Sequence, residues 1–188
     1  MIILFAAVDE KQIRDFENGV INEEAMTSRI AEADRIELNQ IDRVFNILTE
    51  EDEYSPYWNA FDGEILAGGN GKTLLIEYFS IENEDGDSGG FEVCDPAVYI
   101  TDEKVKEACT LLKEIDENAF KKMYDSKTKR LTKLSFLSKR KRELKQNAED
   151  IYELFWSELD TLKKFYEKTA AEGRYIIISN FYEEEDFN

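Results

Sequence analysis

The sequence predicts a single domain of the α+β class, and three observations lead to that prediction. The chain has 188 residues, an ordinary length for one domain. Apolar runs of strand length lie near both ends, at 2–8 and 174–181. Between them, apolar residues recur at helical spacing in several stretches. Hydrophobic residues make up 42% of the chain, enough to fill a core at this length.

The first fifty residues predict one strand followed by three helices. The run 2–8 is apolar throughout, so we expect a strand buried on both faces of a sheet. Asp9 suits the N-cap of a short first helix, and Gly19 suits its C-terminal end. A second helix is expected over 23–33. A third begins near Asn39, a plausible cap, and its apolar residues then follow helical spacing.

The middle of the chain predicts loops and short strands. The glycine-rich segment 68–71 separates the apolar runs 64–67 and 73–81, a pattern typical of a hairpin. The acidic segment 82–90 contains glycines and predicts a loop. A strand is expected to return at 91–93.

Two helices are expected between residues 101 and 124. Thr101 suits an N-cap, and acidic residues follow it at the positive end of the helix dipole. The apolar stripe of this helix reaches Ile115. A shorter helix is expected over 118–124, leading into a basic region.

The last fifty residues predict a long helix, a strand and a tail. Helical periodicity extends over 138–172, and we expect a break near Ser157 because so long a helix is unusual in a globular domain. Gly173 ends the helix and 174–181 forms the final strand. The acidic segment 182–188 is expected to be a tail.

The charge of the chain restricts the partners that it can have. The sequence contains 42 acidic and 24 basic residues, a formal net charge of −18. Such a field repels phosphate backbones and anionic membranes, which disfavours nucleic acid and membrane partners. The first apolar run is too short for a signal peptide, and no apolar run could span a bilayer. Cys94 and Cys109 form no paired motif, so we expect buried free thiols in a reducing cytoplasm.

The absence of histidine excludes several chemistries. Serine–histidine and cysteine–histidine catalysis and histidine-ligated metals cannot occur in this chain. The sequence does not exclude Cys94 as a nucleophile whose thiolate is activated by a lysine. The abundance of carboxylates makes any single acidic pair uninformative as a general acid and base. The sequence therefore predicts no catalytic residue, no cofactor and no metal ligand.

Two segments imitate ligand-binding motifs incompletely. Lys72 and Thr73 follow a glycine as in a phosphate-binding loop, but Leu66 replaces the first glycine and a strand-like run follows. The spacing of acidic residues over 83–92 imitates a calcium loop, but Ile81 occupies its first ligand position. A hairpin and a solvated loop are the favoured interpretations.

An acidic run followed by aromatic residues forms a candidate partner-binding surface. Exposed aromatic side chains beside charge are enriched at recognition surfaces. The alternative is a lid that packs on the protein itself. The residues are Glu50, Glu51, Asp52, Glu53, Tyr54, Tyr57 and Trp58.

The segment 121–145 has the opposite charge. It holds eleven Lys and Arg residues against Asp125 and Glu143, a net charge of +9. One interpretation is a solvated helix face compensated by acidic neighbours; the other is a docking patch for an acidic partner or RNA. The core of this basic patch is Lys139, Arg140, Lys141 and Arg142.

Segments spread over most of the chain resemble the YfbM-like family, DUF1877. They are 5–10, the strand and turn FAAVDE; 41–49; 96–105, PAVYITDEKV; and 162–178, LKKFYEKTAAEGRYIII. Family members commonly have a tryptophan and a histidine where this chain has Ile41 and Phe45.

The resemblance implies a fold and no established reaction. We expect a compact YfbM-like domain over 1–181, with a mixed β-sheet covered by several helices, and the acidic tail 182–188.

Charge and the missing histidine favour a non-enzymatic, acidic, cytoplasmic binding protein. Its expected partner is a basic protein, in the manner of an immunity or inhibitor protein. One alternative is an enzyme that uses carboxylate or tyrosine groups in a pocket formed by the central loops. A second is RNA binding through the basic segment 121–145.

Overall fold

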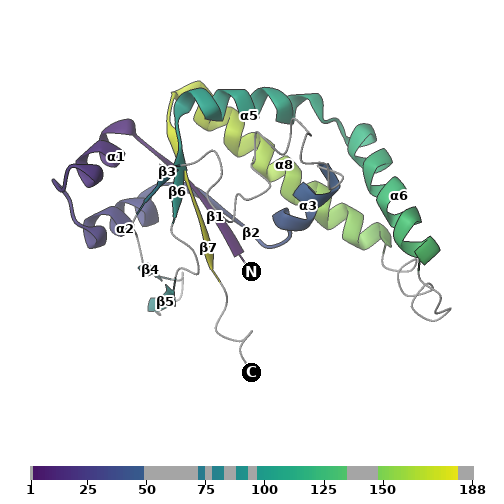
Figure 1. The fold of residues 1–188 in the computed structure, drawn as a ribbon, viewed down its shortest axis with the longest axis horizontal. Helices are drawn as coiled ribbons and strands as arrows, with labels where there is room; N and C mark the ends of the chain where they lie inside the picture. Colours follow the sequence, from purple (N-terminus) through teal and green to yellow (C-terminus); the bar gives the residue numbers. More distant parts are fainter. Residues whose placement is uncertain are drawn as a thin grey trace.

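Helices cover both faces of a five-stranded sheet with the strand order β2-β1-β7-β6-β3 (Figure 1). The computed structural model describes residues 2–48, 72–74, 78–82, 88–92, 97–134 and 148–181. The strands of the sheet are β1 Ile2–Val8, β2 Asp34–Leu38, β3 Lys72–Thr73, β6 Val98–Ile100 and β7 Tyr175–Phe181. The strands β4 Tyr78–Glu82 and β5 Ser88–Glu92 form a separate hairpin. The helices are α1 Glu10–Glu17, α2 Glu23–Glu32, α3 Ile41–Leu48, α5 Asp102–Glu114, α6 Glu117–Leu134 and α8 Ala148–Glu172.

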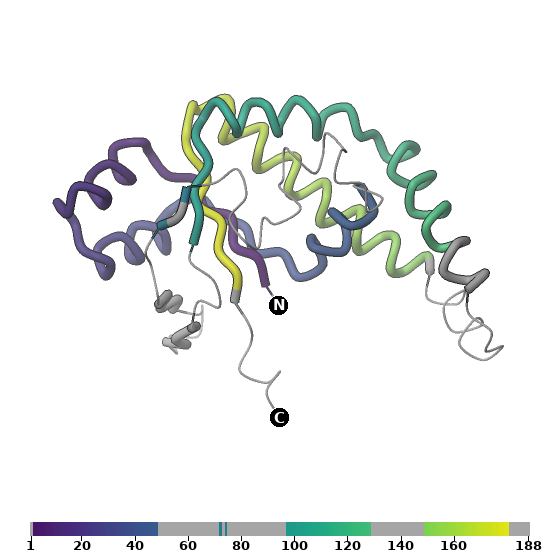
Figure 2. The backbone as a smooth tube through the Cα atoms, viewed as in Figure 1, coloured from purple at the N-terminus to yellow at the C-terminus, as the bar shows by residue number. Residues whose placement is uncertain are grey.

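The α+β class is confirmed, but among the described strands the sheet is antiparallel and not mixed. Figure 2 shows the reason. The chain leaves β1 through α1 and returns through α2, so β2 starts at the end where β1 stops. It leaves β6 through α5 and α6 and returns through α8, so β7 starts where β6 stops. Such out-and-back helical connections give antiparallel neighbours, whereas a single crossover helix gives parallel ones.

The central strand β1 is buried on both faces, as its apolar run predicts. Successive side chains alternate between the faces. The large core lies between the sheet and α3, α5, α6 and α8, and it receives Ile3, Phe5 and Ala7. The small core lies beneath α1 and α2, and it receives Leu4, Ala6 and Val8.

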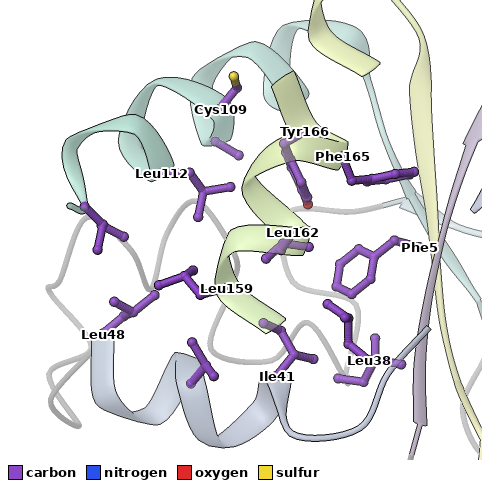
Figure 3. Packing of buried hydrophobic residues seen from close by; sticks show 14 of the residues in the cluster. Phe5, Leu38, Ile41, Leu48, Cys109, Leu112, Leu159, Leu162, Phe165 and Tyr166 are labelled. Atoms are coloured by element: carbon purple, nitrogen blue, oxygen red, sulfur yellow. The ribbon is translucent and has the colours of Figure 1, made fainter. Parts of the chain in front are cut away.

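The helix α8 crosses the large core without a break, so the break expected near Ser157 is wrong. Its buried residues Phe155, Leu159, Leu162 and Tyr166 continue at helical spacing on both sides of that position. Figure 3 shows Leu159 and Leu162 projecting into the space between α3, α5 and the sheet. Burying each large apolar side chain contributes roughly 1.5–3 kcal/mol, which favours a continuous helix.

The helix α6 is longer than predicted. We expected a helix over 118–124, but α6 has 18 residues and extends into the basic segment. Phe120 and Tyr124 bury one face of its first turns, and lysine and arginine are good helix formers. The basic residues therefore do not terminate α6.

The edge strand β2 was not predicted. Its five residues are three charged ones together with Ile36 and Leu38. A single residue separates it from the end of α2. Its pairing with β1 is a tertiary contact, with Phe5 opposite Ile36. The helix α3 begins as expected, but its cap comes from Glu158 of α8 instead of Asn39.

The strand expected over 73–81 is divided in two. Lys72 and Thr73 pair with β6 in the main sheet, while 78–82 pairs with 88–92 in the hairpin. Both ends of the loop expected over 82–90 lie on strands, because β4 ends at Glu82 and β5 begins at Ser88. Residues 83–87 lie outside the described residues. The expected partner strand 64–67 and the expected tail 182–188 lie outside the described residues.

Candidate functional site

Both surfaces predicted to bind partners lie outside the described residues. This applies to the acidic and aromatic run from Glu50 to Trp58 and to the basic patch from Lys139 to Arg142. Their roles stay predictions. The remaining candidate surfaces are found around α1 and α2 and at the junction of α8 with β7.

The turn between α1 and α2 has a fixed backbone and an exposed apolar tip. Gly19 has a φ of +68°, which ends α1 in a left-handed conformation. The N–H of Val20 donates to the carbonyl of Asp15 at 2.8 Å, and that of Gly19 donates to Phe16 at 3.0 Å. These are the two bonds of a Schellman motif. The Val20 side chain is nevertheless 70% exposed, so a rigid turn presents it to solvent.

The helix α1 is attached to the sheet by a tyrosine–glutamate hydrogen bond. The hydroxyl of Tyr99 in β6 donates to Glu17 Oε1 at 2.6 Å. The Tyr99 ring stacks on Tyr175 of β7 with 6.1 Å between centroids. Burial, followed by the hydrogen bond to Glu17, raises the pKa of Tyr99 above its usual value, so this phenol stays protonated.

An open cleft of about 240 Å³ lies where β1 ends and β7 begins. It is lined by two arginines, two carboxylates, an amide and two alanines: Arg29, Arg174, Asp9, Glu32, Gln12, Ala7 and Ala33. The two arginines and two carboxylates give this lining a net charge of zero. Small alanine side chains at two of the seven positions leave the space open.

Arg174 is fixed by ion pairs on one side of the cleft. Its Nη2 binds Asp34 Oδ2 at 3.0 Å and also contacts the carboxylate of Glu172. Asp34 in turn contacts Lys168. The Nη1 of Arg174 donates to the carbonyl of Ala7 at 3.4 Å. Hydrogen bonds from Lys168 and Arg174 lower the pKa of Asp34, so this network stays charged at neutral pH.

Among the described residues, Arg29 and Glu32 have no comparable partners. They lie three residues apart on α2, and residues at that spacing share one face of a helix. The closest ion-pair partner of Arg29 in the described part of the chain is Asp15, with Nη1 and Oδ2 3.9 Å apart. Within the described ranges, the Glu32 carboxylate forms no hydrogen bond or ion pair. Both side chains have hydrogen-bonding capacity to spare.

Two lysines in the described part of the basic segment contact groups of neighbouring helices. Lys121 binds Glu149 at 3.1 Å and lies over the ring of Tyr152, 4.0 Å from its centroid. The Nζ of Lys127 donates to the carbonyl of Asn46 at 2.5 Å. These contacts join α6 to α8 and α3.

The two imitated motifs lie on strands where they are described. Lys72 and Thr73 form β3, whereas in a phosphate-binding loop the lysine and the hydroxyl residue stand at the start of a helix. Ile81 pairs with Gly89 in the hairpin, and residues 83–87 lie outside the described part. Among the described residues, no three acidic or cysteine side chains gather as metal ligands would.

Cys109 is a buried free thiol, as predicted, while Cys94 is not among the described residues. Within the described ranges, no helix has both the length and the apolar character that crossing a bilayer requires.

Comparison with known proteins identifies the family. The model for "Domain of unknown function (DUF1877)" matches residues 1–179. The chain belongs to the DUF1877 family. The crystal structure of YfbM, a protein of unknown function from Escherichia coli, matches this DUF1877 chain with a TM-score of 0.58 and 16% identity. That match covers 97% of this chain and 100% of YfbM. The search of curated proteins gives no match.

The resemblance predicted from the sequence is therefore confirmed, and at this identity the structural match shows a shared fold. The cleft residues of this DUF1877 domain were missed in the sequence. Arg29 and Glu32 look like ordinary surface charges on a helix, and Arg174 follows a helix-ending glycine far along the chain. No local signal could have joined them, because β7 pairs with β1 only in the folded sheet.

Proposed function

We propose that this DUF1877 domain is a non-enzymatic, cytoplasmic binding protein that recognises a basic protein partner. The observation that carries the proposal is its charge, −18 over 188 residues. Opposite charge on a partner speeds the encounter and disfavours wrong partners, more than it sets the final affinity.

The described α1–α2 layer supports this proposal. Residues 9–33 contain seven acidic and three basic side chains. At the tip of the layer, the exposed Val20 is followed by Glu23 and the exposed Glu24 in the first turn of α2. An apolar contact flanked by carboxylates suits a basic surface that also offers an apolar pocket. The predicted surface from Glu50 to Trp58 would extend the same kind of recognition.

The observations favour neither alternative function. Two of the described lysines of the basic segment, Lys121 and Lys127, contact acceptors within the protein, which weakens an RNA interface there. Among the described carboxyl groups, burial raises the pKa of Glu158, but this group caps α3 and does not line the cleft. A general acid of raised pKa in a pocket, as an enzyme would use, is therefore not found among the described residues.

The test begins with the immobilised full-length chain and a lysate of its native host. Bound proteins are eluted with a salt gradient and identified, and one basic protein is then purified. We expect its association rate to fall about tenfold or more from low to high ionic strength. The absence of any basic partner, or a rate that ignores salt, would contradict the proposal.

A matched pair of variants tests the α1–α2 tip. Glu24→Lys reverses an exposed charge at the second residue of α2, and Glu103→Lys makes the same change at the second residue of α5. We expect the first change to slow association more than the second. Val20→Ser should speed dissociation without changing the salt dependence. Equal effects of the two charge reversals would show that the partner does not dock at this tip.

A further inference from the structure

We propose that the cleft between α2 and the site where β1 ends and β7 begins binds a free α-amino acid, with the ligand carboxylate on Arg29 and the ligand ammonium on Glu32. The proposal rests on the cleft alone and does not depend on a protein partner.

The shape of the cleft limits the ligand to a small molecule. Its volume of about 240 Å³ lies below the roughly 300–1,000 Å³ of sites that hold drug-sized ligands. Ala7 and Ala33 contribute small apolar side chains, which leave room beside the charged groups. A compact ligand with charges close together suits this space.

The charges of the cleft select a ligand with both signs. Two arginines and two carboxylates line it, so a phosphate or a simple cation would meet a like charge as well as an opposite one. An α-amino acid carries a carboxylate and an ammonium on the same carbon, so each of its charges can face an opposite one. Zwitterion recognition thus follows from a lining that is neutral overall but carries groups of both charges.

The side chains of Arg29 and Glu32, which have unused hydrogen-bonding groups, lie on one face of α2. Arg29 has five guanidinium donors, and within the described ranges the nearest carboxylate oxygen that pairs with it is 3.9 Å away. The planar guanidinium fork matches the two oxygens of a carboxylate. One turn further along, the Glu32 carboxylate can accept from an ammonium, since no described group occupies it.

Two further residues shape the ends of the cleft. The Oε1 of Gln12 accepts from the backbone N–H of Asp9 at 2.8 Å, which fixes the start of α1 at the rim. Arg174 is held in place by Asp34 and Glu172, so this wall of the cleft is ordered before a ligand binds. A site whose walls are already fixed loses less entropy on binding.

The test is a titration of the ¹⁵N-labelled full-length protein with pools of free amino acids, followed by calorimetry on the amino acid that binds. We expect shifts at the backbone amides of residues 9–12 and 29–34. N-acetylation or amidation of the ligand should each weaken binding tenfold or more, roughly the loss expected for a charged hydrogen bond. Acetate and methylamine alone should not compete.

Matched variants separate the site from a general charge effect. Arg29→Gln and Glu32→Gln should each weaken binding about tenfold or more. The controls are Arg43→Gln on the exposed side of α3 and Glu114→Gln, which occupies the last residue of α5 as Glu32 occupies that of α2. Melting curves confirm that all four variants fold. The proposal is overturned if no pool shifts these amides at about 10 mM ligand, if acetate binds equally well, or if the control variants weaken binding as much.

Discussion

Gln40 donates its backbone N–H to the carboxylate of Glu158 at 2.8 Å, although 118 positions separate the two residues. The second oxygen of the same carboxylate accepts from the N–H of Asn39 at 3.0 Å. A side chain of α8 thus satisfies two backbone donors at the start of α3 and places a negative charge at its positive end. This contact fixes the turn between β2 and α3 against the long helix.

Glu158→Ala should destabilise the fold by about 1–2 kcal/mol, as the loss of a helix cap does elsewhere. Glu158→Gln keeps one acceptor and should cost less. Urea unfolding followed by circular dichroism measures both. Glu153→Ala, an exposed position on the same helix, is the control and should change stability little. An equal loss in the control would show that the cap contributes nothing.

Asp34 should make stability depend on pH in the acidic range. Hydrogen bonds from Lys168 and Arg174 lower its pKa from the usual 3.8, so the group binds fewer protons folded than unfolded near that pH. Its contribution is therefore present above about pH 4 and is lost as the pH falls through the lowered pKa. The melting temperature of Asp34→Asn should lie below that of the unchanged protein at pH 7, and the difference should shrink towards pH 2. High salt should shrink it as well, because the network is exposed. If the difference in melting temperature does not change with pH, the loss of stability comes from packing and not from the charge of Asp34.

The Tyr99–Glu17 hydrogen bond should couple α1 to the sheet. Tyr99→Phe removes the donor and should cost about 1 kcal/mol. A double-mutant cycle with Glu17→Ala isolates the pair, and we expect a coupling energy of about 0.5–1 kcal/mol. Additive losses would show that the two residues act separately. Because the pKa of Tyr99 is raised, its contribution should persist up to the alkaline range in which ordinary tyrosines ionise.

The large core should depend on Leu162. This side chain is fully buried, and Leu162→Ala should cost about 2–5 kcal/mol by loss of contacts and formation of a cavity. Leu154→Ala makes the same change on the same helix at a position that is 48% exposed, and it should cost less than about 0.5 kcal/mol. Urea unfolding of the two variants compares them directly. Similar losses would contradict the packing of α8 in Figure 3.

The hydrophobic pattern predicted most helices and the terminal strands of this domain. Strand β1 was recognised because burial on both faces requires an uninterrupted apolar run, and α5 because Val105, Ala108 and Leu112 repeat at helical spacing. The edge strand β2 has no such run, since three of its five residues are charged. The break expected near Ser157 of α8 was wrong because the cost of a long helix is local, whereas the burial that outweighs it comes from α3, α5 and the sheet.

The amino-acid sequence by itself determined the class of the fold, the family, the negative charge and the exclusion of histidine chemistry, because these depend on composition and short-range periodicity. The tertiary structure alone decided which strands are neighbours, which residue caps α3, and that Arg29, Glu32 and Arg174 line one cleft. The physical reason is that β1 and β7, from opposite ends of the chain, pair at the centre of the sheet. That pairing brings groups from distant parts of the chain together, and no sequence window of local length contains them all.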